Sequence, residues 1–313
     1  MKIDIEKSIR MIVRIRTAEE FIASKFFEEK IFSFLHLTIG QEASAVGVAA
    51  ALKSDDLMMG NHRSHGHYLA KGGDLTKMIY EVFGDQRGCC NGFGGSMHML
   101  DRDVGFTGST PILGSIPPLA VGQSFALKLQ NKNNVTVAFL GDGAAEEGVF
   151  MESVNLAANK KCNIIFVIED NKYSVASKML DRKSENYSHK KLFEGLGAHY
   201  IRENGQSVSS TFAAASDARM VAEQGVPVVL HLDLVRRHGH SGPMKENDQA
   251  DYRHDYDTLE FREENDCIQI AKMEACELGF KNDIVDFWIN DEHEKVLDCV
   301  NKIKETISVR DLS

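Results

Sequence analysis

Long hydrophobic runs and an excess of basic residues are both missing from this chain of 313 residues. Its longest apolar stretches, such as Ala45 to Leu52, are far too short to span a bilayer. The N-terminal residues mix charged and apolar side chains, without the uninterrupted apolar core of a signal peptide. Lys and Arg number 36 against 46 Asp and Glu, so the formal net charge is −10. This balance argues against membrane and nucleic-acid partners, although a local cationic pocket for a small phosphate stays open.

Paired cysteines are also lacking. The six cysteines lie at positions 89, 90, 162, 267, 276 and 299, without the spacing of a zinc ribbon or a disulfide scaffold. We expect the adjacent Cys89 and Cys90 to be reduced thiols. A reducing cytoplasm is then the simplest compartment for the protein.

Two common phosphate-binding motifs are absent as well. The chain has neither a Gly-x-Gly-x-x-Gly fingerprint nor a Walker loop. It has no internal repeat, no low-complexity segment and no linker that divides it. We therefore expect one domain over residues 1–313, with a helical N-terminal segment over 1–31 and a helical tail over 256–313.

The apolar residues that are present predict an α/β fold. Continuous apolar runs of strand length cover 135–140, 163–170 and 226–235. Helical periodicity covers 3–31, 39–52, 74–83, 146–161 and 210–225, with Asp74 as the expected N-cap of the third. Strand, helix and strand in succession indicate a parallel sheet with helices on both faces. Between residues 84 and 122 the chain is rich in glycine, and we expect a long functional loop.

The stretch "LGDGAAEEG", from Leu140 to Gly148, follows the first predicted strand. Asp142 stands at its carboxyl end, and Asn171 stands at the end of the next strand, with twenty-seven residues between Gly143 and Asn171. Ligands of parallel sheets bind at such ends, and carboxylate, amide and backbone carbonyl oxygens suit Mg²⁺. Glycines would let the backbone approach a diphosphate, and a helix starting near Ala144 would direct its N–H groups to it. The alternative is a tight turn whose aspartate caps the helix.

Several further segments, taken together, resemble one enzyme family. They are "HLTIGQEA" (36–43), "HRSHGH" (62–67), "GGSMHM" (94–99), "GDGAAEEGVFMESVNLAA" (141–158), "DNKYS" (170–174) and "RRHGHS" (236–241). In this order they resemble the alpha subunits of thiamine-diphosphate-dependent 2-oxo acid dehydrogenases, which include the pyruvate, branched-chain 2-oxo acid and acetoin enzymes. The resemblance implies the diphosphate-binding domain of the thiamine-diphosphate fold.

The resemblance also implies roles for individual residues, with thiamine diphosphate and Mg²⁺ as cofactors. Asp142, Asn171 and the backbone carbonyl of Tyr173 would hold the metal. His65 and His240 match the two active-site histidines of the family. The residues that would contact the cofactor are His62, Arg63, Leu113, Gly141, Gly143, Ala144, Asn171, Val175 and His240.

Three positions depart from the family pattern. His62 replaces a tyrosine, Pro111 stands where a glycine is common, and the segment after His240, over 241–253, lacks the usual Ser-Asp pattern. "HRSHGH" could instead be a zinc site, but its spacing offers no separate fourth ligand. His98 and His238 are expected to be structural histidines.

Thiamine catalysis requires a glutamate that activates the pyrimidine ring, and we find no second domain that would carry it. The resemblance therefore implies a separate beta subunit, an α₂β₂ heterotetramer and a lipoyl acyltransferase that receives the acyl group after decarboxylation of a 2-oxo acid or cleavage of acetoin. Two alternatives remain open. One is a split transketolase-like enzyme with an aldehyde acceptor, and the other is a non-catalytic alpha-like module.

Overall fold

The centre of the protein is a parallel β-sheet. A computed structural model describes residues 2–28, 30–31, 33–243, 261, 264–304 and 306–307. Its main sheet has six strands, in the order β2 (Phe106–Ser109), β1 (Leu57–Gly60), β3 (Thr136–Gly141), β4 (Ile164–Asp170), β8 (Val228–Asp233) and β7 (His199–Asn204). Every neighbouring pair in this sheet is parallel. The predicted α/β class is therefore confirmed, and the three predicted strands correspond to β3, β4 and β8.

The central strands are buried on both faces, which explains their continuous apolar sequences. In β3, Val137 and Phe139 belong to one apolar core, while Ala138 and Leu140 belong to the other. Successive side chains of a strand point to opposite faces. A strand between two cores therefore needs apolar residues at every position.

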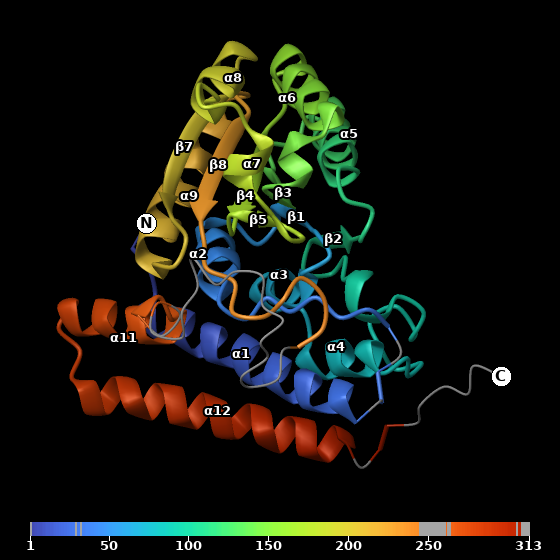
Figure 1. Cartoon of the computed structure of the whole chain (residues 1–313), viewed down its shortest axis with the longest axis vertical. Coiled ribbons are helices and arrows are strands. Elements are labelled where there is room, and N and C mark those ends of the chain that lie inside the picture. The colour runs from blue at the N-terminus through green and yellow to red at the C-terminus, as the bar shows by residue number, and fades with distance from the viewer. Residues whose placement is uncertain are drawn as a thin grey trace.

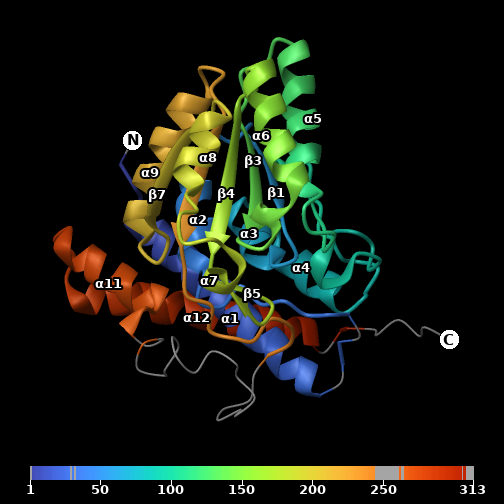
Figure 2. The ribbon, with the colours of Figure 1, turned by 45° about the horizontal axis from the view of Figure 1, so that its top comes forward.

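Helices cover both faces of the sheet. α2 (Glu42–Ala51) and α9 (Val208–Ala222) supply residues to the first core. α5 (Ile116–Leu129), α6 (Gly148–Lys160) and α8 (His189–Gly195) supply residues to the second. Figures 1 and 2 show α5 and α6 side by side along one flank of the sheet, with α9 on the opposite flank.

The two ends of the chain form a further helical layer. α1 (Ile5–Phe27) packs against α12 (Asn282–Lys304) and α11 (Cys267–Glu277), as Figure 1 shows. Arg10 Nη1 lies 2.5 Å from Asp291 Oδ2, so an ion pair also joins α1 to α12. The helices predicted at both ends are thus present, although residues 256–260, 262–263, 305 and 308–313 lie outside the described part. Within the described residues, no helix is both long and apolar enough to cross a membrane.

The region predicted as a long loop over 84–122 is only partly irregular, so that prediction needs correction. It contains the short helix η1 (Gly95–Met97), strand β2 and the first half of α5. Two prolines at the start of α5 concealed its beginning, because the first turn of a helix tolerates proline. The predicted helix at 74–83 is α4 (Leu75–Val82), and the side chain of Asp74 caps it as expected.

Candidate functional site

A cavity of about 180 Å³ opens at the carboxyl ends of the central strands. β3 and β4 are neighbours with Gly141 opposite Glu169, so Asp142 and Asn171 leave adjacent strands at the same edge. The predicted residues that line the cavity are His62, Arg63, Leu113, Gly141, Asp142, Gly143, Ala144, Asn171, Tyr173, Val175 and His240. The lining residues that sequence reasoning missed are Gln41, Asn61, Glu147, Glu169, Ser174 and Arg236.

Asp142 is a buried carboxylate with one hydrogen-bond partner among the described residues. Arg182, at the end of α7 (Met179–Arg182), donates from Nη2 to Asp142 Oδ2 at 2.5 Å. Burial raises the pKa of Asp142, the nearby Asp170 adds to this, and Arg182 acts in the opposite direction. Within the described residues, Oδ1 of Asp142 accepts no hydrogen bond. One oxygen of the carboxylate therefore stays available to a cation.

Asn171 has a fixed amide orientation. Its Nδ2 donates to Gln41 Oε1 at 3.0 Å, and its Oδ1 accepts from the backbone N–H of Tyr173 at 3.3 Å. The chain then forms a hairpin of β5 (Tyr173–Ser174) and β6 (Ser177–Lys178). In the hairpin loop, Val175 has a φ of 53°, a strained conformation for a β-branched residue. Such strain often accompanies functional loops, and Val175 lines the cavity.

Gly141 and Gly143, on either side of Asp142, lie in different surroundings. A Cβ added at Gly143 would approach Ser174 Oγ to 2.3 Å, so only glycine allows this contact. A Cβ at Gly141 would meet no atom within 4 Å, which leaves free space beside the cavity. The predicted helix start near Ala144 needs correction: a short 3-10 turn, η2 (Ala144–Glu146), comes first, and α6 begins only at Gly148.

The same cavity contains the positive charge of Arg63 and two imidazoles, from His62 and His240. Arg63 is buried, and its guanidinium donates to the carbonyl of Leu37 at 2.7 Å and to that of His240 at 2.8 Å. Burial, together with the charge of Arg63, lowers the pKa of His62 well below its ordinary value and that of His240 to about 4. Both imidazoles are therefore neutral near pH 7.

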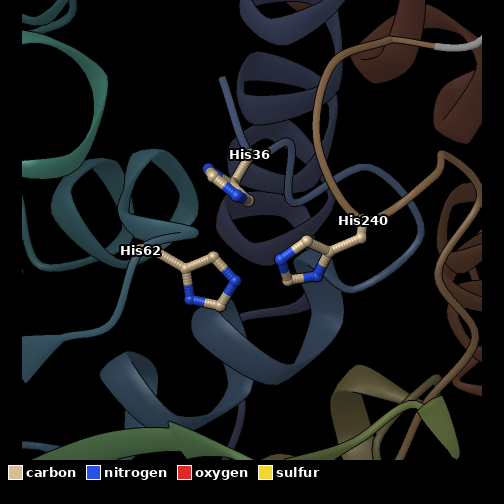
Figure 3. Close-up of side chains that lie close together, drawn as sticks. All are labelled: His36, His62 and His240. Atoms are coloured by element: carbon tan, nitrogen blue, oxygen red, sulfur yellow. The ribbon is translucent and has the colours of Figure 1, made fainter. Parts of the chain in front are cut away.

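His36, a further histidine that sequence reasoning did not place in the site, contacts these two rings. Its ring centre lies 4.7 Å from that of His62 and 5.1 Å from that of His240. Figure 3 shows the three imidazoles converging from three separate segments of the chain. The only sequence signal for His36 is its position in "HLTIGQEA", one of the segments that carry the family resemblance.

His65, predicted to be an active-site histidine, is not among the cavity-lining residues. Its ring is fully buried, with Nδ1 2.8 Å from Glu19 Oε1 and Nε2 2.9 Å from Ser96 Oγ. It lies in the first turn of α3 (Ser64–Ala70). Arg63 is the N-cap residue before this helix, and its guanidinium bonds to the carbonyls of Leu37 and His240. Its side chain and that of His65 therefore reach different places although they are close in sequence.

Glu169 is the buried acid that sequence reasoning missed. It accepts hydrogen bonds from Ser44 Oγ at 2.7 Å and Asn61 Nδ2 at 3.1 Å, and it contacts His67 Nε2 at 3.1 Å. Burial works against ionisation, but His67 and the other donors hold the pKa of Glu169 below its ordinary value. Glu169 is therefore ionised near pH 7 and places a negative charge in the cavity wall. The sequence signal for Glu169 was the pair of acidic residues "ED" at the end of an apolar strand.

The donors around the cavity suit a divalent cation and a phosphate anion together. Asp142 and Asn171 offer oxygen ligands of the type that Mg²⁺ prefers. Arg63 and Arg236 supply positive charge, and both nitrogens of His62 are buried without a partner within the described residues. A neutral imidazole can donate one hydrogen bond to a phosphate oxygen. The described residues thus fit a metal-bound diphosphate.

Comparison with known proteins gives the same family as the sequence motifs. The family described as "Dehydrogenase E1 component" matches residues 10–308. The alpha subunit of acetoin:2,6-dichlorophenolindophenol oxidoreductase from Cupriavidus necator is 36% identical over 271 residues, which cover 86% of this chain and 80% of that protein. The protein of the same name from Bacillus subtilis is 34% identical over 310 residues, covering 96% and 87%.

Pyruvate dehydrogenases are similar to the chain as well. The alpha subunit of the pyruvate dehydrogenase E1 component from Rhizobium meliloti is 33% identical over 276 residues, which cover 88% of this chain and 78% of that protein. The family match extends over nearly the whole sequence, and it includes every segment that lines the cavity. The chain therefore belongs to the dehydrogenase E1 component family, as an alpha subunit of its thiamine-diphosphate-dependent enzymes.

Proposed function

We propose that this chain binds magnesium and thiamine diphosphate in the cavity and, with a beta subunit, decarboxylates a 2-oxo acid. The observation that carries the proposal is the convergence of eleven predicted cofactor and metal residues on one cavity. These residues come from segments far apart in the sequence, between positions 62 and 240. Chance would not bring so many residues of a single predicted site to one place.

Each part of the site has a proposed task. Asp142, Asn171 and the backbone carbonyl of Tyr173 would hold Mg²⁺. Arg63 would hold the diphosphate as a permanent cation, and His62 would donate a hydrogen bond in place of the tyrosine usual in the family. When bound, the thiamine ring supplies a carbon nucleophile that adds to a carbonyl group. The protein residues provide the charge and orientation that this chemistry needs.

His240 is the proposed acid–base residue of this chain. It lies on the segment after β8 and lines the cavity. Because the pKa of His240 is lowered to about 4, its imidazole is neutral near pH 7 and can accept a proton. His65 has both ring nitrogens engaged by Glu19 and Ser96, so we propose that it positions the loop around it and does not itself contact the cofactor.

The assembly follows from the family. The relatives from Cupriavidus necator and Rhizobium meliloti are both named as alpha subunits. A beta subunit that supplies the activating glutamate would complete the site, in an α₂β₂ heterotetramer whose acyl product passes to a lipoyl acyltransferase. The chain would form one diphosphate-binding domain over 1–313 and act in the cytoplasm.

Acetoin is the second substrate candidate. Two of the similar proteins are named as acetoin oxidoreductases, at 36% and 34% identity. Acetoin is neutral, whereas a 2-oxo acid carries a carboxylate that Arg236 would attract. Because Arg63 is assigned to the diphosphate, Arg236 is the cavity residue that favours the acid as the first candidate.

The test is reconstitution with a co-expressed beta subunit. Titration calorimetry should give saturable binding of thiamine diphosphate that depends on Mg²⁺. Carbon dioxide release from 2-oxo acids, with lipoamide as acceptor, would support the proposal. Dye reduction by acetoin without carbon dioxide release would assign the acetoin activity. Turnover only with aldehyde acceptors would indicate a transketolase-like enzyme, and absence of cofactor binding would indicate a non-catalytic module.

A further inference from the structure

Three imidazoles meet beside the cavity, and each comes from a different part of the chain. His36 lies between α1 and α2, His62 lies between β1 and α3, and His240 follows β8. One ring nitrogen from each lies within 4.8 Å of the others. Figure 3 shows all three rings facing a common space. The arrangement is therefore a three-dimensional cluster that the sequence spacing does not reveal.

Several nitrogens of this cluster lack partners. Both ring nitrogens of His62 and Nδ1 of His36 are buried and have no hydrogen bond within the described residues. Only 8% of His62 is exposed, so water does not readily replace the missing partners. Buried imidazoles are almost always hydrogen-bonded or bound to a metal. The unsatisfied nitrogens indicate a ligand from outside the chain.

We propose that His36, His62 and His240 form a site for Zn²⁺, with a fourth coordination position open to the cavity. Three atoms at most 4.8 Å apart have a common centre within about 2.8 Å of each. Zinc–imidazole bonds are about 2.0–2.1 Å long, so each ring would move by less than about 1 Å. Rotations about the side-chain bonds can provide a movement of this size.

The choice of ion follows from the ligands and their neighbours. Three neutral nitrogen ligands without a carboxylate favour a borderline transition-metal ion over the hard Mg²⁺. Arg63 and Arg236 lie close enough to lower the pKa of His240, and the same charges weaken the binding of any cation. Only an ion that bonds strongly to imidazole would overcome this repulsion. This site is therefore distinct from the oxygen site at Asp142.

In the part of the chain that the structure describes, two other clusters of ligand-type side chains are satisfied by the protein itself. Glu81, near Cys89 and Cys90, accepts hydrogen bonds from four backbone N–H groups, between Cys90 and Gly95. In the second cluster, Asp170 bonds to His231 and to Lys172. Neither has buried, unpartnered nitrogens like those of His62, so neither carries the same inference.

Occupation of the site has a functional consequence that rests on the proposed function. A bound zinc ion takes the lone pair of His240, which the proposed reaction uses to accept a proton. His62 keeps one N–H group when its other nitrogen binds the metal, so the hydrogen bond to the diphosphate can persist. Zinc would therefore act as a reversible inhibitor that stops turnover and leaves the cofactor in place.

The experiment measures metal binding by the untagged full chain, without activity as the readout. Co²⁺, as a spectroscopic substitute for zinc, should give the strong visible absorption of a four-coordinate site, and Zn²⁺ should displace it. The variants His36→Gln and His62→Gln should each weaken Zn²⁺ binding at least about 100-fold, because each removes a ligand. The matched controls are His199→Gln, at an exposed histidine, and Cys89→Ser. Thermal unfolding of each variant checks that it is folded.

Each outcome decides the proposal. Loss of the visible band in the two histidine variants, with both controls unchanged, supports the site. A sulfur-to-cobalt charge-transfer band that disappears in Cys89→Ser would place the ion on the thiols and overturn it. Absence of saturable binding, or equal affinity in folded His62→Gln and the unsubstituted chain, would also overturn it. None of these results depends on decarboxylase activity, so they test the zinc site independently of the proposed function.

Discussion

The guanidinium of Arg182 holds the carboxylate of Asp142, with Nη2 2.5 Å from Oδ2. The same guanidinium contacts Glu146 from Nε at 3.1 Å, and the carbonyl of Ser177 accepts from its Nη1. The buried charge of Asp142 is thus balanced from within the chain. A divalent cation at Asp142 would share this carboxylate with Arg182, through the oxygen that Arg182 leaves available.

Arg182→Gln should destabilise the metal-free chain. It leaves the charge of Asp142 buried without its partner, and we expect the free energy of unfolding to fall by about 2 kcal/mol at pH 8. Arg182 works against the rise in the pKa of Asp142, so its loss raises this pKa further. The loss of unfolding free energy caused by Arg182→Gln should therefore grow as the pH rises, and it should disappear once Asp142 is protonated in acid.

Urea unfolding at pH 8 and at pH 3, which is below the ordinary and therefore also below the raised pKa of Asp142, measures this effect. The control is Arg202→Gln, which breaks an ion pair with Asp233 whose side chains are 52% and 36% exposed. That change should cost less than about 1 kcal/mol. An equal loss for Arg182→Gln at both pH values would contradict the electrostatic explanation.

Asp142→Ala and His240→Ala should fail in different ways in the reconstituted enzyme. Asp142→Ala removes a charged metal ligand, and cofactor binding should weaken by about 3 kcal/mol or more. His240→Ala should leave cofactor affinity within about tenfold but lower kcat about 100-fold or more, as for a lost acid–base group.

Calorimetry and steady-state kinetics on the same preparations separate the two effects. If both variants lost cofactor affinity equally, and excess thiamine diphosphate restored turnover, His240 would be a cofactor anchor. The acid–base role proposed for it would then be wrong.

Glu169→Gln tests the buried acid in the cavity wall. The change keeps the shape but removes the charge that strengthens the hydrogen bonds from Ser44 and Asn61. We expect a loss of about 2 kcal/mol in unfolding free energy at pH 7. The folded pKa of Glu169 is below its ordinary value of 4.5, so this stability is present above that value and is lost as the pH falls through the lower, folded pKa.

Guanidinium unfolding at pH 7, with exposed Glu194→Gln as the control, measures the difference. An unchanged midpoint for Glu169→Gln would show that the charge contributes nothing to the fold.

The titration of His240 predicts a dependence of stability on pH. Burial and the nearby arginines lower its pKa from 6.5 to about 4 in the folded chain. The unfolded chain therefore binds a proton first as the pH falls, and stability declines from pH 6.5 towards pH 4. His240→Gln should reduce this decline without changing stability at pH 8. Thermal unfolding over this range is the measurement, and an identical slope in the variant would contradict the lowered pKa.

Sequence patterns predicted the central sheet because its strands are buried on both faces. β3, β4 and β8 are buried along most of their length and contain continuous apolar runs, which are a clear strand signal. β7 escaped prediction because it lies at the sheet edge and reads "HYIREN", with mostly polar and partly exposed residues. β1 escaped because it has only four residues.

The residues of the candidate site also fall into those that the sequence could place and those that it could not. Asp142 and Asn171 could be placed because both end strands that the sequence already indicated. His36 could not be placed, since its approach to His62 and His240 depends on how three connecting segments pack. The direction of the His65 side chain could not be predicted from the sequence either, because it depends on which side of α3 contacts Glu19 in α1.

The packing of α1 against α12 has a consequence for synthesis. The ribosome makes α1 about 250 residues before it reaches α12, so the apolar side of α1 is synthesised long before this partner exists. Contacts between such distant residues slow folding and leave hydrophobic surface exposed meanwhile. We therefore expect nascent chains stalled before Asn282 to be captured by chaperones and degraded by proteases, and released full-length chains to resist both.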